Sequence, residues 1–571
     1  MAEIVSRVYN NFRGVDFRGE EINLVRSPDS VNMWKDYKET ESIRTRPGCE
    51  KVVDIGSGAQ VYGIFFFKHE MIVHHGTKLY KVVNGVKTEI FSGLREGKSD
   101  SFVYEDTFYF KDGLHYLKYD GSKIEAVVGY VPTTYIGRNP HGGGKQHEDV
   151  NMLSSRRINT FLADNASTDY HLDAMGIDED FVPIIKVNDK VVPTTDYAVD
   201  YVKGIIKFSQ APTKEGTDGR DNVSIEFSKT VRKYSDLIQK CTLLQVFDNR
   251  VFFSGNPLYP NVVWHCSLND PSYCSDLDFY PEGMDESPIT GLVAGNNALW
   301  VFRKGSDANT NVFYHTPTLD DEYGKIYPST HSSVSIGCVG GAVNFNDDIV
   351  FFSPRGMEGI SGDVTTEQAL AHRSSLVDRK LLADESFRSL VDWNTINSLC
   401  VAEWEGYLLV FLDYCVYLAD SRAKFTNGDH IEYEWFYWEL PVSVICSRVH
   451  ENKLYIGCAD GTVRTFSYDA TENAIRSYWV TPLDKFKYPH KLKTTNKRGC
   501  VVEATGDISL YAKLEDTDFE LIGEYTGVTD YFVSRIKRKK FKDIQLKFHS
   551  DTRFSLETAT LECFVGGYIK R

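Results

Sequence analysis

Short alternations of apolar and polar residues, bounded by Asn, Asp and Gly, recur through most of this chain. The clearest example lies between Val444 and Ser467, where three alternating segments are separated by His450-Glu451-Asn452 and by Asp460-Gly461. This pattern predicts a short antiparallel meander, because Asn, Asp and Gly adopt the backbone conformations that tight turns need. Six other segments repeat it, and the seven polar pivots fall near residues 70, 106, 249, 297, 347, 406 and 452.

The spacing of these pivots indicates a repeating architecture. Most neighbouring pivots are about 36 to 59 residues apart, which suits one four-stranded propeller blade per repeat. We therefore predict a mainly β fold built on a β-propeller of six to seven blades. A set of unrelated hairpins in a β-rich protein is the alternative. The interval from 106 to 249 is too long for one blade, so it predicts an insertion.

The insertion has its own pattern of alternation. The segments IIKVNDKVV, YAVDYVKG and IIKFSQAP predict at least three strands, with Asn188-Asp189 at a hairpin turn. We expect a small β-sandwich here, and two additional propeller blades are the alternative. One segment, residues 365–393, has apolar residues near helical spacing and predicts a helix between the fifth and sixth repeats.

The two ends of the chain differ from the repeats. The first 50 residues are polar and broken by Pro28 and Pro47, which predicts an extended arm that other surfaces must order. From about Lys485 the chain becomes basic and strand-like again, which predicts a second β domain. The expected organisation is an arm (1–50), a propeller in two parts (51–145 and 233–484), the inserted sandwich (146–232) and a C-terminal β domain (485–571).

Composition describes a globular chain with an acidic balance. The 571 residues are 42% apolar and 13% aromatic, and the formal net charge is −16. That charge argues against a general nucleic-acid binder, but it suits a surface along which DNA must slide without sticking. The 11 cysteines include no CxxC pair, which fits a chain folded in a reducing cytosol. We find neither a signal peptide nor an apolar run of 18 residues, and expect no membrane span.

Candidate sites for catalysis are weak. The loop His141-Gly-Gly-Gly144 is similar to a lipase oxyanion loop, but the G-x-S-x-G elbow is missing, so a flexible loop is favoured. The acidic pivots at 105–106 and 346–348 could supply paired carboxylates for glycoside hydrolysis, yet acidic residues recur at this turn position in most repeats. His74 and His75 would point to opposite faces of a strand. We predict no catalytic residues, no metal site, no cofactor and no enzyme activity.

One short segment concentrates positive charge. A basic run near the C-terminus is either a solvated strand and turn or a docking patch for an acidic partner or for DNA at a channel mouth. An acidic partner is the better functional interpretation, because the rest of the chain is acidic. The run consists of Arg535, Lys537, Arg538, Lys539, Lys540 and Lys542.

The N-terminal segment carries a resemblance to a known family. Three short motifs, NFRGVD at 11–16, SPDSVNM at 27–33 and IRTRPGC at 43–49, contain Asn32, Arg44 and Arg46. This opening resembles that of the tail nozzle, or head-to-tail stabilisation, proteins of short-tailed bacteriophages. The insertion, from Tyr170 through Phe227, resembles small sandwich modules of phage tail proteins.

The resemblance implies a virion structural protein. Such a tail nozzle or hub is made in the host bacterial cytoplasm and forms a hexameric ring below the portal and adaptor rings. The ring continues the DNA channel, retains the genome, passes it during ejection without sequence-specific binding, and carries tail fibres or spikes. The alternatives are a glycan-binding or glycan-hydrolysing propeller acting on the host surface, and a propeller scaffold for protein partners inside a cell.

Overall fold

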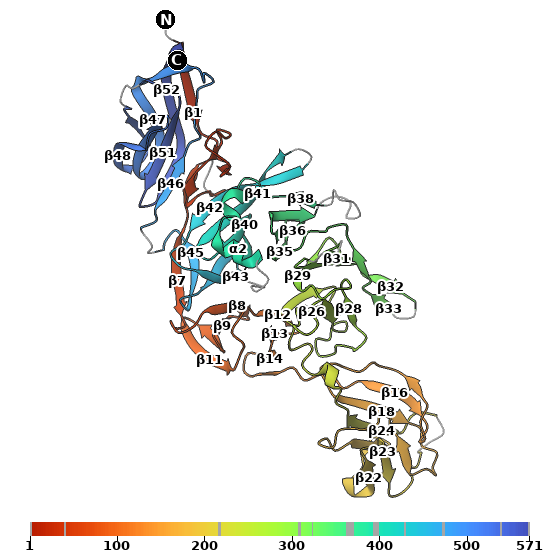
Figure 1. Ribbon diagram of the computed structural model, residues 1–571. Coiled ribbons are helices and arrows are strands. Elements are labelled where there is room, and N and C mark those ends of the chain that lie inside the picture. Colours follow the sequence, from red (N-terminus) through yellow and green to blue (C-terminus); the bar gives the residue numbers. More distant parts are fainter. Residues whose placement is uncertain are drawn as a thin grey trace. The chain divides into compact units, whose positions relative to one another are not determined.

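The computed structural model describes residues 3–38, 42–214, 219–305, 310–321, 324–360, 370–391, 399–427, 430–470, 474–536 and 540–568 (Figure 1). Almost all of the regular structure in these residues is strand. The chain forms two compact units, each of which is described by itself. The first contains Met1–Lys98, Trp300–Val312 and His331–Arg571, and the second contains Ser99–Leu299 and Phe313–Thr330.

Four-stranded sheets that follow the order of the chain dominate the first unit. One sheet comprises β8 (Val61–Phe67), β9 (Glu70–His75), β10 (Lys78–Val83) and β11 (Val86–Ser92). Another comprises β35 (Gly340–Phe345), β36 (Asp348–Ser353), β37 (Gly356–Ile360) and β38 (Leu370–His372). The strands β39 (Cys400–Trp404), β40 (Tyr407–Leu412), β41 (Cys415–Asn427) and β42 (His430–Glu439) form a third, within a larger sheet.

The second unit repeats this arrangement. One of its sheets contains β12 (Asp100–Tyr104), β13 (Thr107–Lys111), β14 (Tyr116–Tyr119) and β15 (Ile124–Ala126). Another contains β25 (Leu243–Phe247), β26 (Arg250–Ser254), β27 (Val262–His265) and β28 (Phe279–Pro281). A further four-stranded sheet, whose residues are divided between the two units, contains β29 (Ile289–Gly295), β30 (Ala298–Arg303), β31 (Val312–His315) and β34 (Ser329–His331). The hairpin of β32 (Thr318–Asp320) and β33 (Gly324–Ile326) precedes its last strand.

The predicted pivots are the hairpin turns between the first two strands of these sheets. At six of them two consecutive residues have positive φ, as a type I′ turn requires. At the remaining one, expected near residue 70, the positive φ is at Lys68. The six pairs are Glu105-Asp106, Asp248-Asn249, Asn296-Asn297, Asn346-Asp347, Glu405-Gly406 and Glu451-Asn452.

A strand from near the N-terminus completes the last blade. β43 (Val444–His450), β44 (Lys453–Cys458) and β45 (Thr462–Ser467) form a meander whose fourth strand is β7 (Gly48–Asp54), antiparallel to β45. Each four-stranded sheet is a blade, and with this closure the described residues contain seven. The predicted fold class, mainly β with a propeller, is confirmed.

One continuous sheet of 15 strands joins the β39–β42 blade to the C-terminal domain. From β42 it passes through β5 (Met33–Lys35) and β6 (Ile43–Thr45) to β52 (Phe554–Tyr568). Tyr437 of the blade lies opposite Met33, and Arg44 lies opposite Ser555 of the domain. The domain adds β47 (Lys491–Leu514), β51 (Ile544–Ser550), β46 (Ser477–Val480), β4 (Ser30–Val31), β48 (Glu520–Val528), β49 (Tyr531–Ser534), β50 (Lys540–Phe541) and β1 (Glu3–Tyr9).

The N-terminal segment was expected to need other surfaces, and the same chain supplies them. β1 pairs along its whole length with β52, so that both described ends of the chain lie in one sheet (Figure 1). The short strands β2 (Gly14–Val15) and β3 (Arg26–Ser27) pair with each other, and β4 pairs with β46. Phe12 and Trp34 are buried in a common core with strands of the blade and the domain.

The insertion consists of two sheets over a common apolar core. The larger contains β16 (Thr133–Arg138), β17 (Lys145–Gln146), β18 (Arg156–Phe161), β24 (Val223–Ser228), β20 (Ile184–Val187) and β21 (Lys190–Val191). The smaller contains β19 (Asp169–His171), β23 (Ile205–Phe208) and β22 (Tyr197–Asp200). Phe161, Tyr170 and Ile225 are among the buried residues between them. The hairpin turn predicted at Asn188-Asp189 joins β20 to β21.

The helix predicted over 365–393 is wrong in its extent. Leu370–His372 is the outer strand of a blade, paired with β37, and the helices are two short ones, α1 (Asp378–Leu381) and α2 (Glu385–Val391). Residues 365–369 and 392–393 lie outside the described residues. The apolar spacing that suggested a helix serves the packing of Leu376, Leu381 and Phe387 into one core.

The turn at Gly461 gives a sharp test of blade closure. A Cβ at this position would overlap the carbonyl oxygen of Gly56, and φ is +80°. We expect Gly461→Ala to destabilise the first unit by at least about 3 kcal/mol, because strain and overlap add. Gly85 is the matched control, since its φ is +77° but nothing lies within 4 Å of its would-be Cβ.

Gly85→Ala should cost only about 1 kcal/mol, the backbone strain alone. Calorimetric unfolding of the two variants measures the difference. Equal effects would mean that close packing at Gly461 does not hold the blade shut.

Candidate docking site

The described part of the basic run lies beside a small cavity of the C-terminal domain. Arg535 and Lys540 line this cavity, which has a volume of about 230 Å³. Lys542 is exposed but is not part of the lining. Lys537, Arg538 and Lys539 lie outside the described residues. The structure therefore brings two of the six predicted docking residues together.

The lining of this cavity is amphipathic. Its apolar part comes from the end of β47, the start of β48 and the segment after β49, and includes Leu514, Ile522 and Ile536. Glu515 and Glu520 supply carboxylates. Neither Arg535 nor Lys540 forms an ion pair with another residue in the described part of the chain. The cations are thus available to a partner, with apolar surface next to them.

A buried lysine holds the backbone of this region. Lys493 is fully buried, and its ammonium donates to the carbonyl oxygens of Tyr488 and Lys542. Burial lowers the pKa of Lys493 below its ordinary value. The Lys542 amide donates to the Glu515 carboxylate over 3.0 Å. Both bonds restrain the chain where the basic run ends.

Asn32 and Arg46, the residues singled out in the N-terminal motifs, form a buried junction. Asn32 has φ of 58°, and its Oδ1 accepts from Arg46 Nε at 3.0 Å and from the Glu439 amide at 2.8 Å. Its Nδ2 donates to the carbonyl oxygen of Arg476 at 2.8 Å. One side chain therefore ties the residue after β6 and the end of β42 to the residue that precedes β46.

The other motif residues extend this junction. Arg44 places its guanidinium 4.0 Å from the centre of the Tyr468 ring and 3.6 Å from Asp36. Arg26 forms a buried two-pronged ion pair with Glu434 of β42, at 2.7 and 2.8 Å. These contacts are internal, so the motif residues build the fold rather than an exposed site.

The residues considered for catalysis have structural partners. His74 and His75 are buried, and each ring bonds a glycine carbonyl oxygen, of Gly76 at 3.0 Å and of Gly56 at 2.9 Å. The glycines at 142–144 lie in the turn between β16 and β17. Asp348 receives hydrogen bonds from Arg373 and Tyr433. Among the described residues, no group of three or more His, Cys, Asp and Glu side chains is placed to hold a metal ion.

An aromatic cavity in the second unit was not predicted. It measures about 150 Å³ and is lined by Tyr234, Tyr259, Trp264 and Phe279, with Asp276 as a carboxylate. The Asp276 carboxylate accepts from the Tyr234 hydroxyl at 2.6 Å. Aromatic rings beside a carboxylate are the side chains that bind sugars, so this is the place where the glycan alternative would apply.

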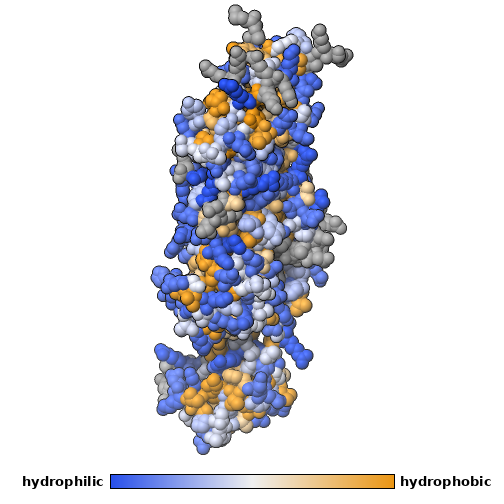
Figure 2. Space-filling view, turned by 90° about the vertical axis from the view of Figure 1, so that its left-hand side faces the viewer, coloured by the Kyte–Doolittle hydropathy of each residue, from blue (hydrophilic) through white to orange (hydrophobic). Residues whose placement is uncertain are grey.

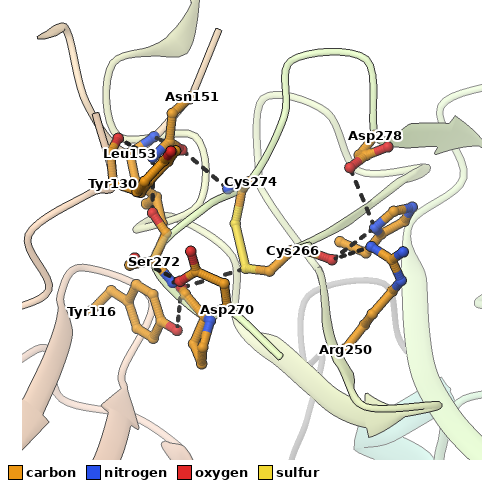
Figure 3. Close-up of a disulfide and its surroundings, with 12 residues drawn as sticks. Tyr116, Tyr130, Asn151, Leu153, Arg250, Cys266, Asp270, Ser272, Cys274 and Asp278 are labelled. Carbon is orange, nitrogen blue, oxygen red and sulfur yellow. Dashed lines mark hydrogen bonds and ion pairs between the residues drawn. A yellow bond between two sulfur atoms is a disulfide. The ribbon is translucent and has the colours of Figure 1, made fainter. Parts of the chain in front are cut away.

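A disulfide in the second unit was also not predicted. Cys266 and Cys274 form this disulfide (Figure 3). Asn151 joins this loop to the chain that leads into the insertion. Its amide group donates to the carbonyl oxygens of Tyr130 and Ser272, and its oxygen accepts from the amides of Leu153 and Cys274 (Figure 3).

His265, next to this disulfide, is held neutral. Its ring bonds the Cys266 carbonyl oxygen at 3.0 Å, and burial lowers its pKa to about 4. Burial likewise raises the pKa of nearby Asp278 to about 6. Both groups are shifted toward their uncharged forms, as expected for side chains removed from water.

Comparison with known proteins adds no family. No family model matches the chain, and no curated protein matches it. BamB from Moraxella catarrhalis is similar over 75% of this chain and 98% of its own, with 9% identity and a TM-score of 0.34. The computationally designed protein Ika8 is similar over 73% of this chain and 99% of its own, with 11% identity and a TM-score of 0.32. The Neurospora crassa Pan2 WD40 domain is similar over 74% of this chain and 96% of its own, with 6% identity and a TM-score of 0.26. At these values the likeness carries no argument, and the fold rests on the sheets themselves. Among the described residues, no helix is long and apolar enough to span a membrane.

The Asn32 junction can be tested without straining the backbone. Asn32→Gly keeps the positive φ but removes three hydrogen bonds from buried groups, so we expect a loss of about 2–4 kcal/mol of stability. Asn84→Gly is the control, because Asn84 also has positive φ, 50°, but is exposed in a turn. Its effect should stay within about 0.5 kcal/mol. Thermal unfolding of both variants measures the difference. Equal midpoints would mean that the Asn32 junction does not stabilise the fold.

His372 predicts a pH dependence of stability. Burial opposes its charge, but hydrogen bonds to Asp378 at 2.6 Å and contact with Glu358 at 3.3 Å outweigh burial and raise its pKa to about 10. Because the unfolded pKa is about 6.5, this stabilisation is complete below pH 6.5 and is lost as pH rises toward 10.

The thermal midpoint of the wild type should therefore fall more steeply between pH 6.5 and 10 than that of His372→Gln. The same substitution at exposed His331 should leave the wild-type slope unchanged. Parallel curves for wild type and His372→Gln would refute the assignment.

Proposed function

We propose that this chain is a virion structural protein, a tail nozzle or hub of a short-tailed bacteriophage. Its copies form a ring, most simply a hexamer, that continues the DNA channel below the portal and adaptor. The ring retains the genome and passes it during ejection. Fibres or spikes attach outside, and the protein resides in the tail of the particle after synthesis in the bacterial cytoplasm.

The N-terminal motifs carry this proposal. Asn32, Arg44 and Arg46, on which the resemblance to nozzle proteins rests, all lie where the last blades meet the C-terminal domain. A resemblance in such residues supports a similar fold, because these residues connect two particular parts of the structure. The proposal thus draws on residues with a defined structural task and not on composition alone.

Charge supports the same function. Residues 485–571 contain 17 Lys and Arg against 12 Asp and Glu, a formal charge of +5, whereas residues 1–484 carry −21. An acidic wall repels phosphates, so DNA can move past it without being held. The basic domain is then the part suited to an acidic protein neighbour, such as the adaptor.

The second candidate function, glycan binding at the host surface, rests on the aromatic cavity around Trp264 and Asp276. Indole fluorescence during titration with soluble glycans tests it. A response that Asp276→Asn abolishes would favour this candidate over the nozzle.

Light scattering on the purified chain, followed by particle imaging, tests the nozzle directly. We expect an assembly of about six times the 64.9 kDa chain with an open axial channel. Duplex DNA should not be retained by this ring at physiological salt. A monomer that binds or cleaves glycans would overturn the proposal.

A further inference from the structure

Four neighbouring strands of the 15-stranded sheet present one face to solvent in the C-terminal domain. In this sheet β52 and β49 flank the first part of β47, and β1 lies beyond β52. Val8 lies opposite Thr560, Thr560 opposite Val501, and Val501 opposite Val533. Directly opposite residues of antiparallel strands share a face, so these four side chains form one row across all four strands.

Further apolar residues lie on the same face. Ile4 is four residues from Val8 on β1, so it points the same way, and it lies opposite Phe564. Tyr531 precedes Val533 by two residues on β49. We call this set the outer face, and its exposed members are Ile4 (59%), Val8 (49%), Tyr531 (62%) and Val533 (45%), with Val501 and Phe564 partly buried.

The opposite face of these strands is the domain core. Val502, Phe532 and Leu561, which alternate with residues of the outer face, are buried in one apolar cluster. The alternation is complete, so the outer face is a second, uncovered apolar surface and not part of a core. Apolar side chains lie at the surface of this domain in the space-filling view (orange, upper part of Figure 2). Exposed apolar residues grouped on one face of a sheet indicate an interaction site.

Cations border the outer face. Arg535 continues the alternation of Tyr531 and Val533, and Lys540 lies opposite Thr494, which lies opposite Phe564. Both cations are exposed and form no ion pair in the described chain. Two carboxylates, Glu503 and Glu562, share the face, and Glu562 accepts from Asn496 at 2.8 Å. The domain as a whole carries +5.

Charge then selects the occupant. Two outer faces placed against each other would bring two domains of +5 together, which repel. Residues 1–484 of a second copy carry −21 and attract this domain. Contact between different surfaces of identical chains is heterologous, and it closes into a ring when the rotation between copies is right.

We infer that the outer face is the self-association surface of this protein, and that it docks on the acidic part, residues 10–484, of a second copy. The inference rests on the proposed function only in that both require self-association. It adds which surface makes the contact, and that the copies are arranged head to tail.

Sedimentation of the full-length chain over a concentration series tests the surface. The double variant Val8→Glu, Val533→Glu places two carboxylates on the outer face. Both valines are exposed and lie on edge strands, so the fold does not depend on their side chains. We expect self-association to weaken at least about tenfold, because apolar contact is lost and repulsion from the acidic neighbour is gained. Arg535→Glu should weaken it too, and reduce its sensitivity to salt.

The control is Val202→Glu, which changes a valine that is 75% exposed on the inserted sandwich. It should assemble like the wild type, and all variants should keep the wild-type thermal midpoint. A double variant that forms rings as well as the wild type would overturn the outer face and leave the nozzle function standing. A wild-type chain that stays monomeric at every concentration would overturn this inference, and one that also binds or cleaves glycans would overturn the nozzle function as well.

Cross-linking tests the occupant separately. A photo-reactive amino acid in place of Val533 should form cross-links between copies that map, by peptide mass spectrometry, to residues 10–484. Cross-links between copies to residues 3–9 or 485–571 would show that the outer faces meet each other, and would overturn the head-to-tail arrangement.

Discussion

The passage of the N-terminal segment through β5 and β6 is the constraint on which the first unit depends. These two strands of three residues each are the only hydrogen-bonded connection, among the described residues, between the β39–β42 blade and β52 in the sheet order. Without them two long sheets would each expose an unpaired edge, and exposed edges invite aggregation. Buried polar side chains fix this passage. Asn32 and Arg26 each satisfy groups of β42, so the segment cannot slide in register without leaving those groups unpaired.

The same interactions explain why the sequence was hard to interpret at its beginning. Polar residues such as Arg26, Asn32 and Arg46 suggested an extended arm that other surfaces must order, and all three are buried within the same chain. Their partners lie more than 400 residues away in the case of Glu434 and Glu439, and no local pattern announces such a pairing. The blade hairpins were predictable for the opposite reason. A pair such as Glu451-Asn452 fixes its own backbone conformation, and its flanking strands are adjacent in sequence.

The candidate site likewise combines features that are local in the sequence with contacts between distant residues. The cations of the basic run stand out in the sequence, but the apolar lining beside Arg535 comes from Leu514 and Ile522, and the outer face combines residues from both ends of the chain. Only the register of β1, β52, β47 and β49 shows that Val8 and Val533 belong to one surface. The aromatic cavity and the hydrogen bonds of Asn151 could not be predicted for a similar reason, since the residues involved are far apart in the sequence and only the fold brings them together.

The completion of the last blade by β7 has a consequence for folding during synthesis on the ribosome. β7 leaves the ribosome early, while its partner β45 is made about 400 residues later, at Thr462–Ser467. During that interval a strand with Val52 and Val53 has no edge to join, and β1 waits longer still for β52. The nascent chain therefore carries two unpaired strands, β7 until residues 462–467 have been made and β1 until residues 554–568 have been made. Unpaired strand edges invite association with other chains, and neither strand is covered by its native partner during that interval.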